Sequence, residues 1–559
     1  MTTLSTDNAS NLSEAEALLS QGRAQLDTAV EKARTTTDNG RRIDEHQVLT
    51  REAARLATRF EAAAALLKHA VQVEATEPAA DLASAAETYA AETLSTSWNT
   101  LRWQRDAFEF SPDEAESARP TSTNEDWVRR RLTSESYEAA GRLALEHAGV
   151  NNGPILSEGS PSSDAVDLRG ATRRFANEVV RPLAEDIHRR DLLVPDSLIE
   201  QMAAMGYFGM SIPNEHGGVG MSNLLMVVAT EELSAASLPA AGSLITRPEI
   251  LSKALLKGGT DAQRERWLPA IASGEVMVAI SVTEPGTGSD VAHLTCQANP
   301  GVADGREGYL LNGAKAWCTF AGRANILALL ARTSDDAASG HSGLSLFIVE
   351  KETFDGNEFT AEQTTGGRLT GKADATMGYR GMHSFTLQFE DYFVPKENLV
   401  GGEAGVGKGF YLQMDGFAAG RLQTGGRALG LAQASMEAAC QYALDRPQFG
   451  KPIAEYQNTQ YEIGAMAIRI QAARQLTYTA ADAMDRADKK AGLLASMAKL
   501  FSSRAAVDIS QRSQLLHGGW GYAEEFAISR YVADALVLPI FEGVEPILEL
   551  KVIGRGILA

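Results

Sequence analysis

The sequence predicts an α+β protein in which a β domain lies between two helical domains, preceded by an extra helical region. Three observations predict this class. Apolar residues recur at helical spacing before residue 272 and after residue 409. Short β-branched and aromatic runs, separated by Gly and Asp, fill the stretch between them. A stretch rich in Gly, Pro, Ser and Asn marks a linker. We therefore expect a helical extension at 1–150, the linker at 151–164, an α domain at 165–272, a β domain at 273–408 and a second α domain at 409–559.

The extension is rich in alanine and carries apolar stripes with the period of amphipathic helices. Leu18 and Leu26 belong to the first stripe, Leu56 and Phe60 to the second, and Trp98 to the third. We expect these stripes to pack as helices, and they carry no chemical motif. The sequence leaves open whether the extension covers a subunit surface, forms a lid over a substrate entrance or replaces contacts between subunits.

In the β domain, apolar runs at 276–282, 309–311, 326–331, 344–349 and 385–389 alternate with turn residues. This spacing predicts a compact antiparallel unit of strands. From residue 409 onward the helical period returns and continues almost to the end of the chain.

Composition narrows the class of function. Hydrophobic residues make up 44% and charged residues 22% of the chain, as in ordinary globular enzymes. No apolar run approaches the roughly 18–20 residues that cross a bilayer, so we expect no membrane span. The first residues lack the features of a secretory or organelle signal, which favours a cytoplasmic location. The net charge of −20 argues against nucleic-acid binding, and three widely spaced cysteines predict neither a disulfide framework nor a metal site.

Two segments of the β domain could lie against a ligand. Residues 283–290, TEPGTGSD, form a Gly- and hydroxyl-rich turn after a predicted strand, where backbone N–H groups can approach an anionic or planar group. Residues 312–319, NGAKAWCT, place Trp317 and Thr319 on one face of a strand. An ordinary Gly-rich turn and ordinary sheet packing are the alternatives for the two segments taken alone.

Three later segments complete the set of candidates. Arg446, in DRPQFGKP at 445–452, suits a phosphate because the guanidinium group is bidentate and permanently charged. A Gly-Gly turn follows Gln514 in HGGWGY at 517–522. Glu542 stands in FEG at 541–543, and a solvated loop carboxylate is the alternative for this residue taken alone.

The order of domains from 166 to 559, together with these segments, resembles the acyl-CoA dehydrogenase family. RFA at 174–176, PNEHGGVG at 213–220 and EEL at 231–233 also match the family in order. The resemblance implies the fold of that family, with an N-terminal helical domain, a central antiparallel β domain and a C-terminal four-helix bundle. It also implies bound FAD and an acyl-CoA substrate.

The resemblance assigns roles to residues of this chain. Thr283 is expected to contact the flavin ring, Trp317 to pack on it, and the hydroxyl of Thr319 to bond the ring nitrogen that receives hydride. Arg446 is expected to grip the FAD pyrophosphate of a neighbouring subunit, which implies a homodimer or a dimer of dimers. The full set of expected cofactor residues is Thr283, Gly288, Ser289, Trp317, Thr319, Arg446, Gln448, Phe449, Gln514, Gly518 and Gly519.

Glu542 matches the family's catalytic base, which removes the α-proton of the thioester while the β-hydrogen leaves as hydride. Some relatives place the base just before an Arg in the helix after the β domain. Here that position is Gly420, followed by Arg421, and glycine cannot serve. The family usually has Gly-Thr after the base, whereas this chain has Gly543 and Val544. The absent hydroxyl puts one cofactor contact in doubt but leaves the base in place.

Within the family, the long extension and the unusual tail favour a member that acts on a short branched thioester ending in a carboxylate. Such a substrate needs a cation in the acyl pocket, and Arg247 lies on the helix that lines this pocket in relatives. A surface Arg is the alternative for Arg247. The expected substrate-binding residues are Ser289, Arg247, Arg421 and Gly543. A decarboxylating activity is disfavoured because the matching Arg position holds Ala235.

Three other functions remain open at this point. The chain could oxidise another short or branched acyl-CoA, or it could be an acyl-CoA oxidase that passes electrons to oxygen. It could also be a non-catalytic scaffold that keeps the fold, although Glu542, Thr319 and Arg446 are all present. For the favoured dehydrogenase, the expected electron acceptor is an electron-transferring flavoprotein.

Overall fold

The computed structural model describes residues 4–75, 80–117, 119–157 and 159–559. Two compact units divide the chain: residues 1–171 with 424–559, and residues 172–423. The first unit is therefore built from both ends of the chain, and the second from its middle. The boundaries fall inside α7 (Ser163–Phe175) and α13 (Gly409–Asp445).

The N-terminal part of the first unit is helical, as the apolar stripes predict. Its helices are α1 (Leu4–Thr36), α2 (Gln47–Glu74), α3 (Ala80–Trp103), α4 (Pro112–Ser117), α5 (Ser122–Arg131) and α6 (Ser134–Glu146). The stripe residues Leu26, Leu56, Phe60 and Trp98 are buried. In the predicted linker, β1 (Leu156–Ser157) and β2 (Ser160–Pro161) form a small antiparallel pair.

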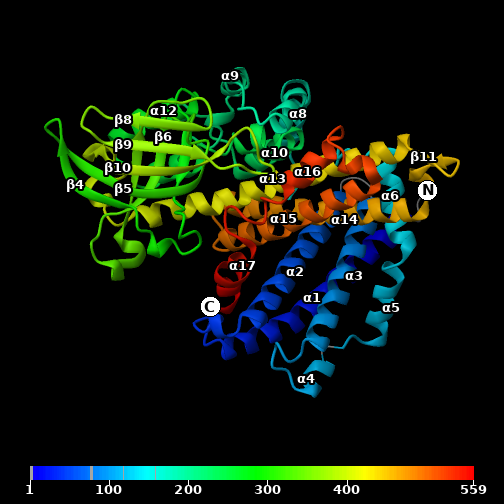
Figure 1. Ribbon diagram of the computed structural model, residues 1–559. Coiled ribbons are helices and arrows are strands. Elements are labelled where there is room, and N and C mark those ends of the chain that lie inside the picture. Colours follow the sequence, from blue (N-terminus) through cyan, green and yellow to red (C-terminus); the bar gives the residue numbers. More distant parts are fainter. Residues whose placement is uncertain (1–3, 76–79, 118, 158) are drawn as a thin grey trace. The chain divides into compact units, whose positions relative to one another are not determined.

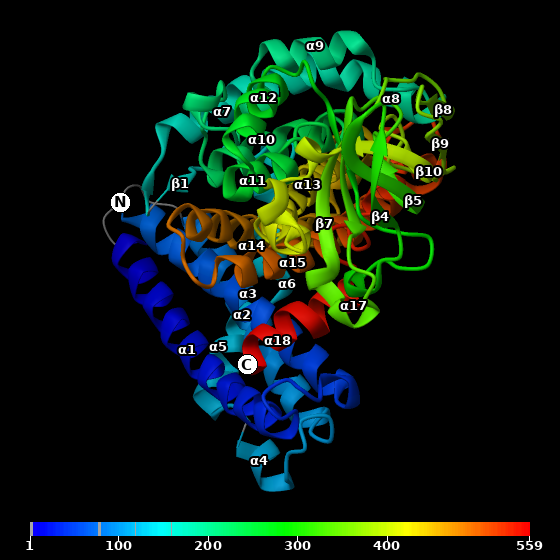
Figure 2. The ribbon, with the colours of Figure 1, turned by 90° about the vertical axis from the view of Figure 1, so that its left-hand side faces the viewer.

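These helices pack on the C-terminal helices of the same unit, α14 (Gln457–Asp485) and α15 (Ala491–Leu516), and Figures 1 and 2 show α2 and α3 beside them. Glycines allow α6 to approach α14 closely. A Cβ at Gly141 would lie 1.8 Å from the carbonyl oxygen of Gln460, and a Cβ at Gly464 would lie 1.8 Å from that of Tyr137. Backbone therefore meets backbone at this crossing.

The chain ends in short elements that also belong to the first unit. After α15 come α16 (Ala527–Ala535), α17 (Glu545–Ile547), a π-helical turn (Leu548–Gly554) and α18 (Arg555–Leu558). The C-terminal segment lies against α2 in both views (Figures 1 and 2). A Cβ at Gly554 would lie 2.3 Å from the Thr50 methyl group of α2, so this contact is tight.

The second unit combines helices with one sheet. The helices are α8 (Arg181–Arg189), α9 (Asp196–Ala204), α10 (Asn223–Ala236), α11 (Glu249–Gly258) and α12 (Asp261–Ala272). The strands are β3 (Val278–Ser281), β4 (Gln297–Ala303), β5 (Arg306–Thr319), β6 (Ile326–Arg332), β7 (Leu344–Glu350), β8 (Glu358–Glu362), β9 (Arg368–Ala373) and β10 (Ser384–Pro395).

The strand order is β3-β6-β4-β5-β10-β9-β8, with β7 paired to β6. The sheet is mainly antiparallel, as expected, but β3 pairs with β6 in parallel. Its core joins strands to helices, because Val278, Ile326 and Ile348 are buried together with Leu251 of α11 and Trp267 of α12. The α+β class and the order of helical and β regions are confirmed.

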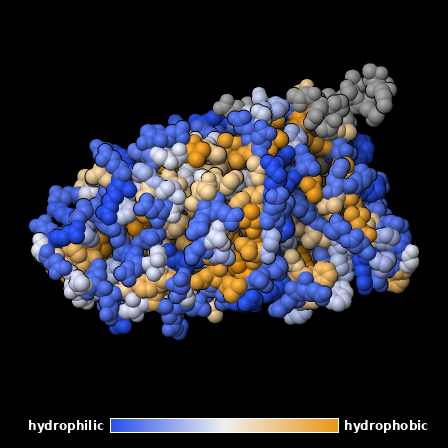
Figure 3. All heavy atoms as spheres, turned by 90° about the horizontal axis from the view of Figure 1, so that it is seen from above, coloured by the Kyte–Doolittle hydropathy of each residue, from blue (hydrophilic) through white to orange (hydrophobic). Residues whose placement is uncertain are grey.

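The three cysteines, Cys296, Cys318 and Cys440, are free and buried. Burial raises the pKa of the Cys296 and Cys318 thiols to about 11, so both stay protonated near neutral pH. On the face drawn in Figure 3, hydrophilic atoms predominate and hydrophobic areas lie between them. No helix among the described residues combines the length and apolarity that a bilayer crossing requires.

Candidate active site

The Gly-rich loop at residues 283–290 follows β3 and closes into a tight turn, as predicted. The N–H of Glu284 donates to the Thr287 carbonyl at 2.9 Å, and the Thr287 N–H donates back to Glu284 at 3.1 Å. No described atom lies within 4 Å of the place where a Cβ of Gly286 or Gly288 would stand. The outer side of the loop, which includes Ser289, is exposed, so a ligand has room to lie against the backbone.

A buried ion pair holds this loop to the sheet. The Lys315 ammonium of β5 lies 3.0 Å from Glu284 Oε1 and donates to the Val282 carbonyl at 2.9 Å. Glu284 also accepts from the N–H and hydroxyl of Thr295 and from the N–H of Cys296. Burial alone would raise the pKa of Glu284, but Lys315 and these donors outweigh it and hold the pKa below its usual value.

The end of β5 carries Trp317 and Thr319. The Thr319 hydroxyl lies 3.0 Å from the hydroxyl of Ser384 on β10, its partner in the ladder. Trp317 is 61% exposed and Cys318 is buried, and a bulge interrupts the regular ladder between Lys315 and Cys318. Trp317 has a φ of 59°, a value that costs a bulky residue energy and often marks functional sites. The N–H of Ala316 donates to Thr283 at 2.8 Å, so the loop lies directly against this strand.

Arg247 lies between a π-helical turn (Leu238–Ser243) and α11. It is 8% exposed, and its Nε donates to the Ser243 carbonyl at 3.1 Å. The alternative of a surface Arg is therefore wrong for this residue. Arg421 lies on α13 and is half-buried. Both cations belong to the second unit.

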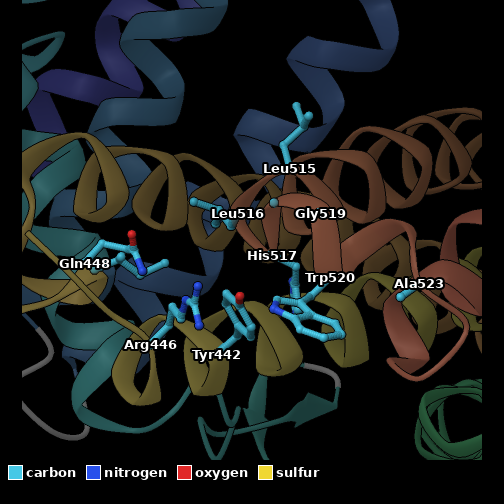
Figure 4. A pocket seen from close by; sticks show the side chains of 11 residues that line it. Tyr442, Arg446, Gln448, Leu515, Leu516, His517, Gly519, Trp520 and Ala523 are labelled. Atoms are coloured by element: carbon cyan, nitrogen blue, oxygen red, sulfur yellow. The ribbon is translucent and has the colours of Figure 1, made fainter.

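The first unit has a cavity of about 560 Å³ (Figure 4). It brings together four expected cofactor residues, Arg446, Gln448, Gly518 and Gly519. The other lining residues are Tyr442, Ile453, Leu515, Leu516, His517, Trp520 and Ala523. Gln514 stands beneath the turn instead, where its Nε2 donates to the Gly521 carbonyl at 3.0 Å. Phe449 does not line the cavity and is 96% exposed.

Aromatic rings form part of the cavity wall. The Tyr442 ring stacks on His517 with centroids 4.4 Å apart, and Figure 4 shows Arg446 beside Tyr442. Burial lowers the pKa of His517, against a hydrogen bond from its Nδ1 to the Ser513 carbonyl. The ring is therefore neutral near pH 7. The sequence did not single out Tyr442, although it stands one helical turn before Arg446 and on the same face.

Glu542 has an unusual backbone conformation in the first unit. Its φ is 54° and that of Gly543 is 102°, so the backbone at the carboxylate is in the left-handed region. The Lys499 ammonium of α15 donates to the Gly543 carbonyl at 2.6 Å. The guanidinium of Arg427, on α13, lies 4.7 Å from the centre of the Phe541 ring. Val544 and Pro546, which depart from the family pattern, begin α17, where a proline at the first turn is favourable.

The sequence had singled out the loop, the strand end, four of the residues that line the cavity and Glu542, but not the residues that support them. Glu284 lies in the segment 283–290 and Lys315 in the segment 312–319. Their opposite charges were the signal that could have predicted the ion pair. Ser384, Lys499 and Arg427 carried no local signal. Among the residues that the structure describes, no three His, Cys, Asp or Glu side chains gather so as to hold a metal ion.

Models of three domains match the chain. The acyl-CoA dehydrogenase C-terminal domain matches residues 12–101 and 407–558, the N-terminal domain matches 162–275 and the middle domain matches 279–392. The match at residues 12–101 extends the similarity to the family into the helical extension, whereas the expected resemblance began at residue 166. One domain model thus matches both the helical extension and the C-terminal helices on which it packs.

Individual proteins are similar over most of the chain. A (2S)-methylsuccinyl-CoA dehydrogenase of Cereibacter sphaeroides is 40% identical over 433 residues, which are 77% of this chain and 76% of that protein. Subunit CarC of the caffeyl-CoA reductase-Etf complex of Acetobacterium woodii is 33% identical, over 68% of this chain and 97% of that protein. The structure of butyryl-CoA dehydrogenase from Megasphaera elsdenii has a TM-score of 0.64 and 28% identity, and covers 71% of this chain and 99% of that one.

The fold, the Gly-rich loop and these relatives define a flavin-dependent oxidoreductase. The chain belongs to the acyl-CoA dehydrogenase family.

Proposed function

We propose that the chain oxidises (2S)-methylsuccinyl-CoA to mesaconyl-CoA, with Glu542 as the base. The observation that carries the proposal is the left-handed turn at Glu542 and Gly543, which Lys499 and the Phe541–Arg427 contact hold in place. Strained backbone of this kind persists where surrounding structure enforces it, and it clusters at active sites. The similarity to a (2S)-methylsuccinyl-CoA dehydrogenase supports the choice of substrate.

In the proposed reaction, the Glu542 carboxylate removes the proton from the α-carbon. The β-carbon loses its hydrogen with both bonding electrons, and the single bond between the two carbons becomes double. The N–H of Glu542 polarises the thioester carbonyl and so makes the α-proton more acidic. Bound FAD would supply the acceptor for the hydride.

The residues present fit FAD. Gly286 and Gly288 leave the loop open to a planar group, and Thr319 supplies a hydroxyl at the end of β5. Arg446 at the cavity suits the pyrophosphate, and Gly518, with a φ of 60°, leaves backbone N–H groups open to an anion. We assign the flavin end to Thr283, Gly288, Ser289, Trp317 and Thr319. We assign the phosphate and adenine end to Arg446, Gln448, Phe449, Gln514, Gly518 and Gly519.

For the substrate, we assign the distal carboxylate to Arg247 and the thioester end to Ser289, Arg421 and Gly543. The burial of Arg247 supports this assignment. An arginine that is 8% exposed favours an anionic partner, and the bond from Nε to the Ser243 carbonyl leaves further N–H donors to contact a ligand.

We further propose a homodimer, or a dimer of dimers, in which Arg446 contacts the FAD of the neighbouring subunit. Large apolar side chains are exposed at the cavity or beside it in sequence, including Leu515 and Tyr522, and this supports an interface there. The electron acceptor is an electron-transferring flavoprotein, as the name of the CarC relative suggests for its own complex. The proposed location is the cytoplasm.

The test is anaerobic reduction of the purified protein by a panel of thioesters. The yellow flavin should bleach with methylsuccinyl-CoA faster than with succinyl-CoA, butyryl-CoA or an aryl-substituted thioester. Faster bleaching by another thioester would overturn the substrate, and a colourless or unreactive protein would indicate the scaffold. Turnover with air as fast as with the flavoprotein acceptor would indicate an oxidase.

A matched pair of variants tests the base. Glu542→Gln should lower the rate of flavin reduction by at least 10²-fold and keep the flavin spectrum. Glu525→Gln replaces an exposed carboxylate of the same unit and should keep the wild-type rate. Equal rates for both variants would remove Glu542 from the mechanism.

A further inference from the structure

The N-terminal helices bond directly to the segment that follows Glu542. Arg55, in the N-terminal half of α2, donates from Nε to Glu549 Oε1 at 2.6 Å. Its Nη2 lies 3.6 Å from Glu545 Oε1. One guanidinium of the extension thus reaches two carboxylates within seven residues of Glu542. Arg55 and Glu549 are 494 residues apart in sequence, yet both belong to the first unit.

Glu549 forms its ion pair with this cation, whereas Glu545 shares it with Arg504. The side chain of Glu549 is 3% exposed and that of Glu545 is 8% exposed. Burial raises the pKa of Glu549, while the hydrogen bond and charge of Arg55 lower it and the neighbouring Glu545 raises it. Removing one partner of a buried ion pair leaves an uncompensated charge, which is strongly unfavourable. Without Arg55, the segment would therefore move or rearrange.

The carboxylates are coupled to the Glu542 turn through short links. The N–H of Glu545 donates to the Pro539 carbonyl at 2.9 Å, which closes the loop that contains Glu542. Arg504 of α15 binds the other oxygen of Glu545 at 2.5 Å. The loop is thus fixed on one side by α15, through Arg504 and Lys499, and on the other by α2, through Arg55.

Other contacts extend the same attachment to the chain end. Lys551 pairs with Asp44, which precedes α2. Arg34 of α1 donates to the Ile557 carbonyl at 3.2 Å. These contacts are made by residues farther along the chain from Glu542 than Glu545 and Glu549 are, so we take Arg55 as the residue of the extension to test.

We propose that Arg55 is a positioning residue for Glu542, and that the extension thereby sets the geometry of proton removal. The inference rests on the proposed role of Glu542 as the base. A base must stand within a few tenths of an ångström of its working position, and a misplacement of about 1 Å can cost two orders of magnitude in rate. Arg55 touches neither substrate nor cofactor in this role and acts through Glu545 and Glu549.

Three variants of the full-length flavoprotein test the proposal. Arg55→Gln should lower the rate constant of anaerobic flavin reduction on the order of 10-fold, with flavin content and the substrate dissociation constant nearly unchanged. Arg55→Lys keeps the charge and should restore most of the rate. Arg23→Gln is the control, because Arg23 binds Glu61 at 2.7 Å and Asp27 at 2.9 Å within the extension. Its exposure of 38% matches the 42% of Arg55, and its rate should stay at the wild-type value.

The outcomes separate this inference from the proposed function. If the substrate reduces the flavin of Glu542→Gln at the wild-type rate, the proposed base is wrong, whatever the result for Arg55→Gln. If Glu542→Gln is inactive and Arg55→Gln matches Arg23→Gln, the base stands and the positioning role is overturned. Should Arg55→Gln not fold, Glu549→Gln replaces it, because the amide keeps the shape and loses the charge. A folded Glu549→Gln protein with the wild-type rate would also overturn the proposal, and a slowed one with normal substrate affinity would support it.

Discussion

Lys315 and Glu284 form an ion pair inside the second unit, with the ammonium 3.0 Å from the carboxylate and almost no exposure of either side chain. The pair ties the Gly-rich loop to β5. Because the folded pKa of Glu284 is lowered, its charge stabilises the fold above the ordinary carboxyl value of 4.5. That stabilisation is lost as the pH falls through the folded pKa. The loop therefore owes its position to two buried charges.

Replacing Lys315 by Met should destabilise the protein by about 3–5 kcal/mol, because it leaves Glu284 buried without its cation. Denaturant unfolding followed by circular dichroism measures this change. Lys372→Met is the control, since Lys372 pairs with Glu358 at 2.8 Å in the same sheet but on its exposed surface. That variant should unfold like the wild type. Equal losses in the two variants would contradict a special role for the buried pair.

Arg446→Gln should weaken FAD binding roughly 10–100-fold, because a charged donor to the pyrophosphate contributes about 1.5–3 kcal/mol. Equilibrium dialysis, with the flavin read at its visible absorbance, gives the dissociation constant. Arg486→Gln removes a comparably exposed Arg at the end of α14, where it pairs with Asp482, and should retain FAD. Retention of FAD by both variants would show that the cavity does not hold the pyrophosphate.

Arg247→Met should raise KM for methylsuccinyl-CoA about 10–100-fold, since a buried charged partner of the distal carboxylate is lost. Butyryl-CoA lacks that carboxylate and serves as the internal control. Its KM should change little, and steady-state turnover with the two thioesters gives the comparison. Equal effects on both substrates would mean that Arg247 supports the helix rather than the carboxylate.

His69 makes stability depend on pH. Burial, and then the nearby Arg474, lower the pKa of His69 from 6.5 to about 4. The unfolded chain therefore binds a proton that the folded chain does not, and the fold loses up to roughly 3 kcal/mol as the pH falls from 6.5 to 4. His69→Gln should flatten the fall in melting temperature across this window. His147→Gln, at an exposed position, should keep the wild-type slope.

Much of the architecture could be predicted from the sequence, because helical and strand periods follow directly from burial on one face. The five predicted apolar runs coincide with β3, β5, β6, β7 and β10. Three other strands of the same sheet, β4, β8 and β9, were missed. β4 contains Pro300 and Gly301, and β8 and β9 carry charged residues, so none of them has a strong strand pattern.

The candidate residues of the site could be named from the sequence, but the residues that support them could not. Motif residues such as Thr283 and Arg446 stand in short recognisable strings. Arg55 and Glu549 have no common string, since they lie on elements that meet through tertiary packing alone. The left-handed conformation of Trp317 and Glu542 was equally hidden, because these residue types rarely adopt it and give no local signal for it.

The two-part construction of the first unit has a consequence for synthesis on the ribosome. Gln457 of α14 donates to Glu138 of α6 at 2.7 Å, and 319 residues separate them in sequence. At typical translation rates, α6 emerges roughly 15–60 s before the helix whose backbone it touches. Until then, the apolar faces that pack on the C-terminal helices lack their native partners. Pairing at such a separation in sequence is slow. Newly made N-terminal helices are thus accessible to chaperones and proteases. Shortening the chain at either end would leave the remaining helices of the first unit without their packing partners.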